Sequence, residues 1–173
     1  KYLAALKAFV RAGELDATRV FSIAQVANIK RLLGEFNEAH LMYEKIIASH
    51  PKFIPGYRGL AEVLFEIAKQ KCKEGVFSSS GYALLKAQNV LLACMELEPT
   101  WQSSRKLLGD IQTFFFNLPE EDIKHAVHKF EQKHSSLPAI YSQYKNKSKT
   151  APLFASHSRT AFLEAGAKAY QQA

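Results

Sequence analysis

Apolar residues recur at helical spacing along most of the chain. Residues 20–33 and 37–49 each place apolar side chains three and four positions apart, with Gly34 between the two stretches and Pro51 after the second. The second stretch carries one apolar stripe, formed by Ala39, Tyr43, Ile46 and Ile47. This pattern predicts two amphipathic helices joined by a short turn.

The stripe has a counterpart 34 residues earlier, because Ala5, Phe9 and Ala12 precede Ala39, Tyr43 and Ile46 by that interval. A stripe of small and aromatic residues with this period is typical of the tetratricopeptide repeat, in which two antiparallel helices stack on their neighbours. Small residues let the helices approach closely, while the aromatic side chain fills the space toward the next repeat. The sequence therefore predicts an all-α tetratricopeptide-repeat solenoid.

The next repeat is longer than the period. Its expected inward positions are Tyr57, Leu60, Ala61 and Leu64 in the first helix, and Ala87, Leu91, Cys94 and Met95 in the second. Pro99 lies 48 residues after Pro51, which is 14 more than the period of 34. Divided between two helices, the insertion predicts about two extra turns in each and a hairpin tip at residues 75–81. Cys94 is then interpreted as a small core residue rather than a nucleophile.

The remaining units are less regular. We expect the following organisation: 1–17 the second helix of a preceding repeat, 18–51 a repeat, 52–99 the lengthened repeat, 100–134 a divergent repeat, 135–159 a basic loop, and 160–173 the first helix of a further repeat. The chain opens KYLAALKAFV without an initiator methionine. We therefore expect it to be one segment of a longer protein.

Composition and charge narrow the function classes. Hydrophobic residues make up 47% of the chain, which supports a packed core, and the formal charge is +7. No apolar run reaches the roughly 18 residues that a membrane helix needs, so we expect no membrane partner. Cys72 and Cys94, in the absence of a signal segment, are typical of reduced thiols in a cytosolic protein.

The sequence offers few motifs that indicate catalysis. The sequence contains no phosphate-binding glycine loop and no nucleophile elbow, so we expect neither an enzyme nor a cofactor. Glu121, His125 and His128 would share one helical face and could ligate zinc. Because such a site also needs convergent ligands and an ordered outer shell, two histidines on a solvated face is the simpler interpretation, and we expect no metal.

The segment 135–159 offers a second candidate chemistry. Between residues 141 and 159 it has no acid and carries cations interleaved with aromatic residues: Tyr141, Tyr144, Lys145, Lys147, Lys149, Phe154 and Arg159. Such a pattern can contact single-stranded RNA through phosphates and stacked bases, and it also suits a solvated connector. A weak RNA contact is therefore the less favoured of the two interpretations.

The concave surface lined by first helices is the usual partner site of a repeat solenoid. The expected register places six polar residues there: Asn28, Arg31, Arg58, Glu62, Lys106 and Asp110. Their signs alternate, and Phe65 and Phe114 flank them, which favours an extended polypeptide over an acidic tail. The alternative is that the polar side chains are only solvated and the two phenylalanines pack against neighbouring helices.

The chain resembles a known family over three longer stretches. It is similar to the large tetratricopeptide subunits of superkiller complexes in the segment LGEFNEAHLMYEKIIASHPKFIPGYRGLAEVLFEIAKQ, in the lengthened hairpin, and in LLACMELEPTWQSSRKLLGDI. The matching positions are Pro51, residues 53–57 and 59–62, and residues 107–110, and the similarity covers about residues 34–113 with the late LEAGAKAY. Trp101 departs from the family pattern, which places its aromatic residue closer to the LLGD step, and residues 119–160 are not matched.

The resemblance implies a scaffold without catalytic residues. In that family the large subunit holds a DExH-type RNA helicase and WD-repeat proteins together, and the assembly feeds messenger RNA to the cytoplasmic exosome for 3′-to-5′ decay. It implies a cytoplasmic location, with the nucleus as a second one. The alternative function is a tetratricopeptide adaptor that binds short peptide motifs and has no role in RNA decay.

Overall fold

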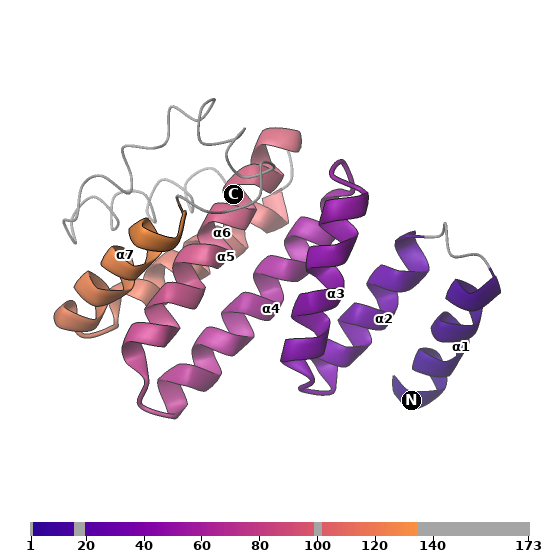
Figure 1. Ribbon diagram of the computed structural model, residues 1–173, viewed down its shortest axis with the longest axis horizontal. Coiled ribbons are helices and arrows are strands. Elements are labelled where there is room, and N and C mark those ends of the chain that lie inside the picture. Colours follow the sequence, from indigo (N-terminus) through magenta and orange to yellow (C-terminus); the bar gives the residue numbers. More distant parts are fainter. Residues whose placement is uncertain (1, 16–19, 99–101, 135–173) are drawn as a thin grey trace.

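The computed structural model describes residues 2–15, 20–98 and 102–134. These residues form α-helices and no strand, in the order α1 (Tyr2–Leu15), α2 (Val20–Leu32), α3 (Phe36–Ser49), α4 (Ile54–Lys73), α5 (Phe77–Leu97), α6 (Gln102–Phe116) and α7 (Glu120–His134). Figure 1 shows α1 to α5 standing side by side in chain order, as expected for a solenoid of antiparallel helix pairs. The expected loop 135–159 and helix 160–173 lie outside the described residues.

Glycine follows the first helix of each of two helical hairpins, α2–α3 and α4–α5. Gly34 and Gly75 have φ angles of 85° and 75°, a left-handed conformation that glycine adopts without steric cost. In both turns the amide that follows the glycine donates a hydrogen bond back to the last turn of the helix: Glu35 N donates to Lys30 O, and Val76 N donates to Lys71 O, each over 2.9 Å. The chain therefore reverses within three residues in both places.

The second hairpin is the longer one, as the insertion predicted. Helices α4 and α5 contain 20 and 21 residues, whereas α2 and α3 contain 13 and 14. The predicted tip at residues 75–81 is wrong in extent, because α5 already begins at Phe77. Ser80, expected in the tip, is fully buried and donates its hydroxyl to Ala68 O over 2.8 Å. The glycine turn completes the reversal early and lets the serines join the helix.

Small residues line the contacts between helices. Ala39, Ala61 and Ala87 have no exposed surface, and Leu60, Leu91 and Cys94 are buried beside them. Most of the other inward positions expected in α4 and α5 are also buried: Tyr57, Leu64 and, in part, Met95. Because alanine lets neighbouring helix backbones approach, the stacked pairs form one continuous apolar core.

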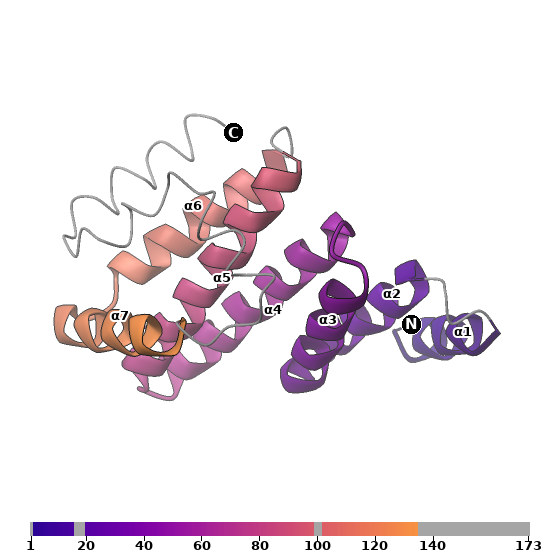
Figure 2. The same cartoon turned by 45° about the horizontal axis from the view of Figure 1, so that its top comes forward.

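Helix α7 departs from the regular stacking. It packs mainly against α5, and α6 packs against α5 and α4. A Cβ atom at Gly81 would lie 2.8 Å from the Ala126 Cβ, so the absence of a side chain there allows α7 to approach the start of α5. Figure 2 shows α7 lying across that end of the long hairpin.

Tyr43 connects three helices. Its ring is buried, its hydroxyl donates to Ala24 O over 3.3 Å, and the ring lies against Gly59 of α4, where a Cβ atom would overlap it. One aromatic side chain of α3 therefore contacts α2 and α4 at once. Glycine at position 59 is what provides the space for it.

We predict that Gly59→Ala lowers the free energy of unfolding by about 1–3 kcal/mol, because the new methyl group overpacks the Tyr43 ring. Urea unfolding followed by circular dichroism measures the loss. The double variant Tyr43→Leu/Gly59→Ala should lose less stability than the two single variants lose together, since the smaller side chain removes the clash. Full additivity of the two substitutions would contradict the contact.

Candidate partner-binding surface

The six residues expected on the first-helix surface lie on α2, α4 and α6. Helix α4 contacts both of the other two, so these helices form one continuous face, here called the α2–α4–α6 surface. Asn28 and Arg31 lie on α2, Arg58 and Glu62 on α4, and the last two residues of the set on α6. All six residues therefore lie on neighbouring first helices.

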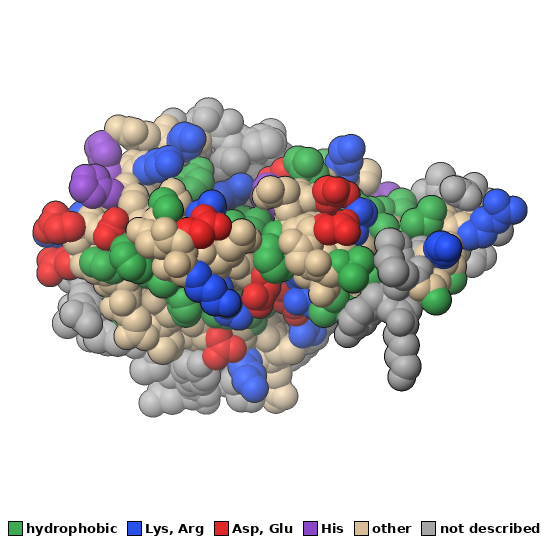
Figure 3. All heavy atoms as spheres, turned by 90° about the horizontal axis from the view of Figure 1, so that it is seen from below, with side chains coloured by type: hydrophobic (Ala, Val, Ile, Leu, Met, Phe, Trp, Pro, Cys, Tyr) green, Lys and Arg blue, Asp and Glu red, His purple; other side chains and the backbone are tan. Residues whose placement is uncertain are grey.

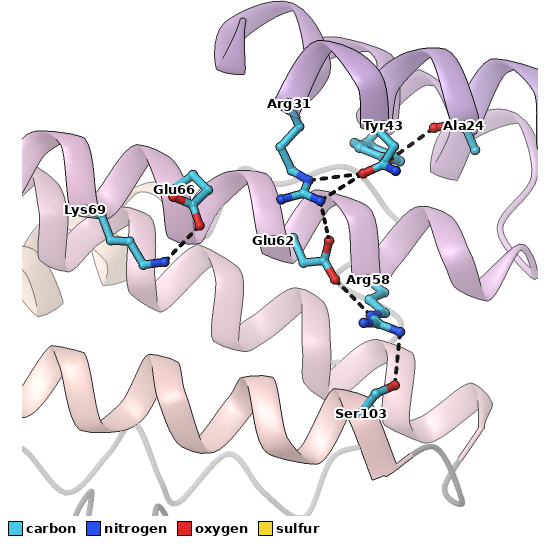
Figure 4. Close-up of polar contacts among 9 residues, drawn as sticks. Ala24, Arg31, Tyr43, Arg58, Glu62, Glu66, Lys69 and Ser103 are labelled. Carbon is cyan, nitrogen blue, oxygen red and sulfur yellow. Dashed lines mark hydrogen bonds and ion pairs between the residues drawn. The ribbon is translucent and has the colours of Figure 1, made fainter. Parts of the chain in front are cut away.

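Four of the six join in a single polar network, drawn in Figure 4. Arg31 donates to Asn28 Oδ1 through Nη2 at 2.9 Å, and its Nη2 lies 3.3 Å from Glu62 Oε2. The other carboxylate oxygen, Glu62 Oε1, accepts from Arg58 Nε at 3.0 Å. Arg58 Nη1 in turn donates to Ser103 Oγ at 3.1 Å, which carries the network onto α6.

Glu62 is the centre of this network because both guanidinium groups share its carboxylate. The side chains of Arg31, Arg58 and Glu62 retain 20%, 38% and 24% of their exposure, so each is reachable from solvent. The alternating signs noted in the sequence are thus paired within the protein. The network ties successive first helices together and still presents polar groups outward.

The remaining expected residues lie further along α6. Lys106 is exposed, and Asp110, one turn later, is half-buried. Ser103, which the sequence did not mark as a site residue, is part of the Glu62 network through its hydrogen bond with Arg58. Serine carries no charge and no apolar periodicity, so no sequence signal marks this position.

Phe65 and Phe114 pack against each other rather than standing free. Their ring centroids are 5.7 Å apart at an interplanar angle of 87°, an edge-to-face contact between α4 and α6. The Lys69 ammonium lies 4.1 Å from the Phe65 centroid and 2.8 Å from Glu66 Oε1. Of the two expectations for these phenylalanines, packing between helices is the one that the structure shows.

Two exposed apolar side chains on α2 were not among the surface residues predicted from the sequence. Phe21 is 58% exposed and Leu32 is 45% exposed. Their spacing from Asn28, seven and four residues, places them on the same face of α2. The signal was available in the sequence, because large apolar residues at helical spacing with Asn28 do not belong to the buried stripe. They add an apolar border to the α2–α4–α6 surface.

The Tyr43 phenol lies beneath the network. Burial raises its pKa to about 12, with Arg31 lowering and Glu62 raising the value by smaller amounts. The neutral phenol is therefore the form that the fold stabilises. The packing contact of the hairpin and the polar surface above it are thus electrostatically linked.

Glu121 and His128, two of the three residues considered as zinc ligands, lie beside other side chains. Glu121 pairs with Lys124 at 2.9 Å, an interaction that lowers the pKa of the carboxyl, and His128 Nε2 lies 2.7 Å from Gln132 Nε2. No group of three or more His, Cys, Asp and Glu side chains in residues 2–15, 20–98 and 102–134 is arranged to hold a metal ion. Burial raises the pKa of the Cys94 thiol, whose sulfur lies 3.7 Å from Ser104 Oγ.

Charge is mixed over the face that carries the two hairpin turns. Figure 3 shows acidic, basic and hydrophobic side chains interspersed there, with histidines at the α7 end. None of the described helices combines the length and the apolar character needed to cross a membrane. The candidate RNA-contacting residues, Tyr141, Tyr144, Lys145, Lys147, Lys149 and Arg159, lie outside the described residues.

We predict that Glu62→Gln lowers the free energy of unfolding by about 1–2 kcal/mol, because two half-buried guanidinium groups lose their shared anion. Glu66→Gln is the matched control, since Glu66 lies one turn away on the same helix and has Lys69 as its ion-pair partner. The control should cost about 0.5 kcal/mol or less. Urea unfolding at low salt measures both, and equal losses would contradict the central place of Glu62.

We further predict an alkaline loss of stability that depends on Tyr43. Because its pKa is about 12 in the fold and 10.0 ordinarily, its contribution is complete below pH 10 and is lost as the pH rises from 10 to 12. Over that interval, the free energy of unfolding should fall by up to about 1.4 kcal/mol per pH unit more in the parent than in Tyr43→Phe. Equal pH dependence of the two proteins would show that the phenol is not stabilised in its neutral form.

Comparisons with known proteins agree with the observed helices. No protein-family model matches the chain. Tetratricopeptide repeat protein 37 of Xenopus laevis is 30% identical over 123 residues, which are 71% of this chain and 8% of that protein. Superkiller complex protein 3 of Homo sapiens is 28% identical over 115 residues, and that of Mus musculus is 38% identical over 61 residues. The matched human and mouse regions cover 66% and 35% of this chain.

The chain spans less than a tenth of the length of each of these relatives, between 4% and 8%. Among solved structures, a thermophilic tetratricopeptide-repeat protein of Thermus thermophilus has a TM-score of 0.58 with 22% sequence identity. That match covers 99% of this chain and 83% of the other. By its helices, its structural neighbour and its relatives, the chain is an all-α tetratricopeptide-repeat solenoid.

Proposed function

We propose that this chain is a non-enzymatic scaffold segment of a superkiller-type assembly. In this role it helps to hold a DExH-type RNA helicase and WD-repeat proteins together in cytoplasmic, exosome-dependent decay of messenger RNA. The observation that carries the proposal is the similarity to superkiller complex protein 3 in two species, over regions of 66% and 35% of this chain. The tetratricopeptide fold supports the scaffold part of the role.

The α2–α4–α6 surface is the proposed partner site. It combines the half-buried network around Glu62 with exposed Phe21 and Leu32 at its α2 border and exposed Lys106 on α6. Apolar contacts supply affinity in such an interface, while the surrounding charges orient the partner. Asn28 and Asp110 complete the set of polar residues that we propose to face the partner.

The second candidate function is a peptide-binding adaptor without a role in RNA decay. Exposed Phe21 and Leu32 on either side of Asn28 favour it, because an extended peptide needs apolar contacts along a groove and polar groups between them. The two functions differ in the partner: a folded helicase or WD-repeat subunit in one case, and a short linear segment in the other.

We predict that the chain, used as bait in cytoplasmic extract, captures a DExH-type helicase or a WD-repeat protein identified by mass spectrometry. The variant Arg58→Glu/Lys106→Glu should lose that protein, because it reverses two charges on the α2–α4–α6 surface. The matched control, Lys45→Glu/Lys52→Glu, reverses two exposed charges on and after α3 and should retain it. Thermal unfolding followed by circular dichroism verifies that both variants are folded.

Two results would contradict the proposal. Capture of unrelated proteins that share one short motif would favour the adaptor function. Loss of the helicase or WD-repeat protein with Lys45→Glu/Lys52→Glu, but not with Arg58→Glu/Lys106→Glu, would place the interface on the opposite side of the solenoid. Neither outcome depends on the stability of the variants, provided that both are folded at the temperature of the capture.

A further inference from the structure

The chain has two joints at which one helix pair meets the next part of the solenoid. The first joint lies between the α2–α3 pair and the α4–α5 pair, and the second joint lies between the α4–α5 pair and α6. At the first joint the Tyr43 ring fills the space left by Gly59, and its hydroxyl donates to Ala24 O. An aromatic ring and a hydrogen bond therefore fix the angle at the first joint.

The second joint has two leucines at the corresponding positions. Helix α4 begins at residue 54 and α6 begins at residue 102, an interval of 48 residues. The same interval places Leu91 where the first joint has Tyr43, and Leu107 where it has Gly59. Leu91 is fully buried, and Leu107 is partly buried against the core. Because leucine has no hydroxyl group to donate, these two side chains contribute only apolar packing, which has no preferred direction.

Helix α6 also buries a polar side chain at a position that is apolar in α4. The interval of 48 residues relates Gln112 to Leu64, and both side chains are buried. Among the described residues, Gln112 Oε1 accepts no hydrogen bond. Burial of an unpaired carbonyl oxygen costs free energy. Gln112 therefore weakens the packing of α6 relative to that of α4.

Two contacts between α4 and α6 reach the α2–α4–α6 surface. The rings of Phe65 and Phe114 meet edge to face, and Arg58 Nη1 donates to Ser103 Oγ at 3.1 Å (Figure 4). These four side chains are partly exposed, whereas Tyr43 is buried. A partner on this surface can therefore touch the contacts that join α4 to α6, while the contact that joins α2 and α3 to α4 lies beneath it.

We propose that the second joint is the adjustable joint of the solenoid, and that a partner spanning α4 and α6 fixes its angle. In the free chain α6 takes a range of angles to α4, while α2, α3 and α4 move as one body. Binding selects one angle, because only at that angle do the residues of α4 and α6 contact the partner together. This regulation of the α2–α4–α6 surface rests on the proposed function, since it places the partner there.

The test is double electron–electron resonance, which measures the distribution of distances between two nitroxide labels on the free chain. Labels on Ala48→Cys and Lys73→Cys span the first joint, and labels on Ala48→Cys and Thr113→Cys span both joints. The three positions are exposed. Cys72→Ser removes the half-buried native thiol, and the fully buried Cys94 stays in place. We expect the distribution that includes α6 to be about twofold broader than the other.

Two variants change the second joint alone. Gln112→Leu gives α6 the apolar residue that α4 has, so it should narrow the Ala48–Thr113 distribution and leave the Ala48–Lys73 distribution unchanged. Phe114→Leu removes the edge-to-face contact, so it should broaden the Ala48–Thr113 distribution and again leave the other unchanged. Thermal unfolding followed by circular dichroism verifies that each labelled chain is folded.

Equal widths for the two label pairs in the parent chain would overturn the proposal, and so would an Ala48–Thr113 distribution that neither variant changes. Addition of the purified helicase or WD-repeat protein from the capture experiment should narrow the Ala48–Thr113 distribution to the width of the other. A distribution that stays broad in that complex would show that the partner does not fix the joint.

The widths in the free chain do not depend on which protein the chain captures. A broad second joint in a chain that captures neither a helicase nor a WD-repeat protein would contradict the proposed function and leave the adjustable joint in place. Capture of such a protein by a chain with equal widths at both label pairs would retain the proposed function and overturn the adjustable joint.

Discussion

The contact between Tyr43 and Gly59 is the interaction on which the arrangement of the repeats depends. Each helix pair has an apolar face of its own, but the angle between pairs must be set by side chains that reach from one pair to the next. Tyr43 does this because its ring occupies the space left by Gly59 and its hydroxyl bonds to Ala24 O. With these three helices fixed, the first helices of successive repeats come into line.

That alignment produces the α2–α4–α6 surface. Arg31 on α2 and Arg58 on α4 can share Glu62 only because α2 and α4 are held side by side, and Arg58 then reaches Ser103 on α6. The resulting network stabilises the stacking and also gives the surface its polarity. A scaffold can use one set of residues for both purposes, since it needs a rigid face rather than reactive groups.

Periodicity and turn residues account for most of what the sequence predicted. The spacing of Ala39 and Tyr43 indicated the repeat, and the 14 extra residues before Pro99 indicated the two long helices. Side-chain partners were harder to predict from the sequence. Pairing across helices, as between Arg31 and Glu62, depends on the angle between repeats and not on spacing within one helix. The approach of α7 to α5 through Gly81 was missed for the same reason: a glycine inside a serine-rich stretch suggests a turn as readily as a close helix contact.

Hydrogen–deuterium exchange of the chain, alone and bound to its helicase or WD-repeat partner, tests the central claim most directly. The claim is that the aligned first helices form the partner site. It predicts slower exchange on binding in peptides from α2, α4 and α6, with α3 and α7 unchanged. Protection confined to α3, α5 or α7 would show that partners bind elsewhere on the solenoid, and that the network around Glu62 serves stability alone.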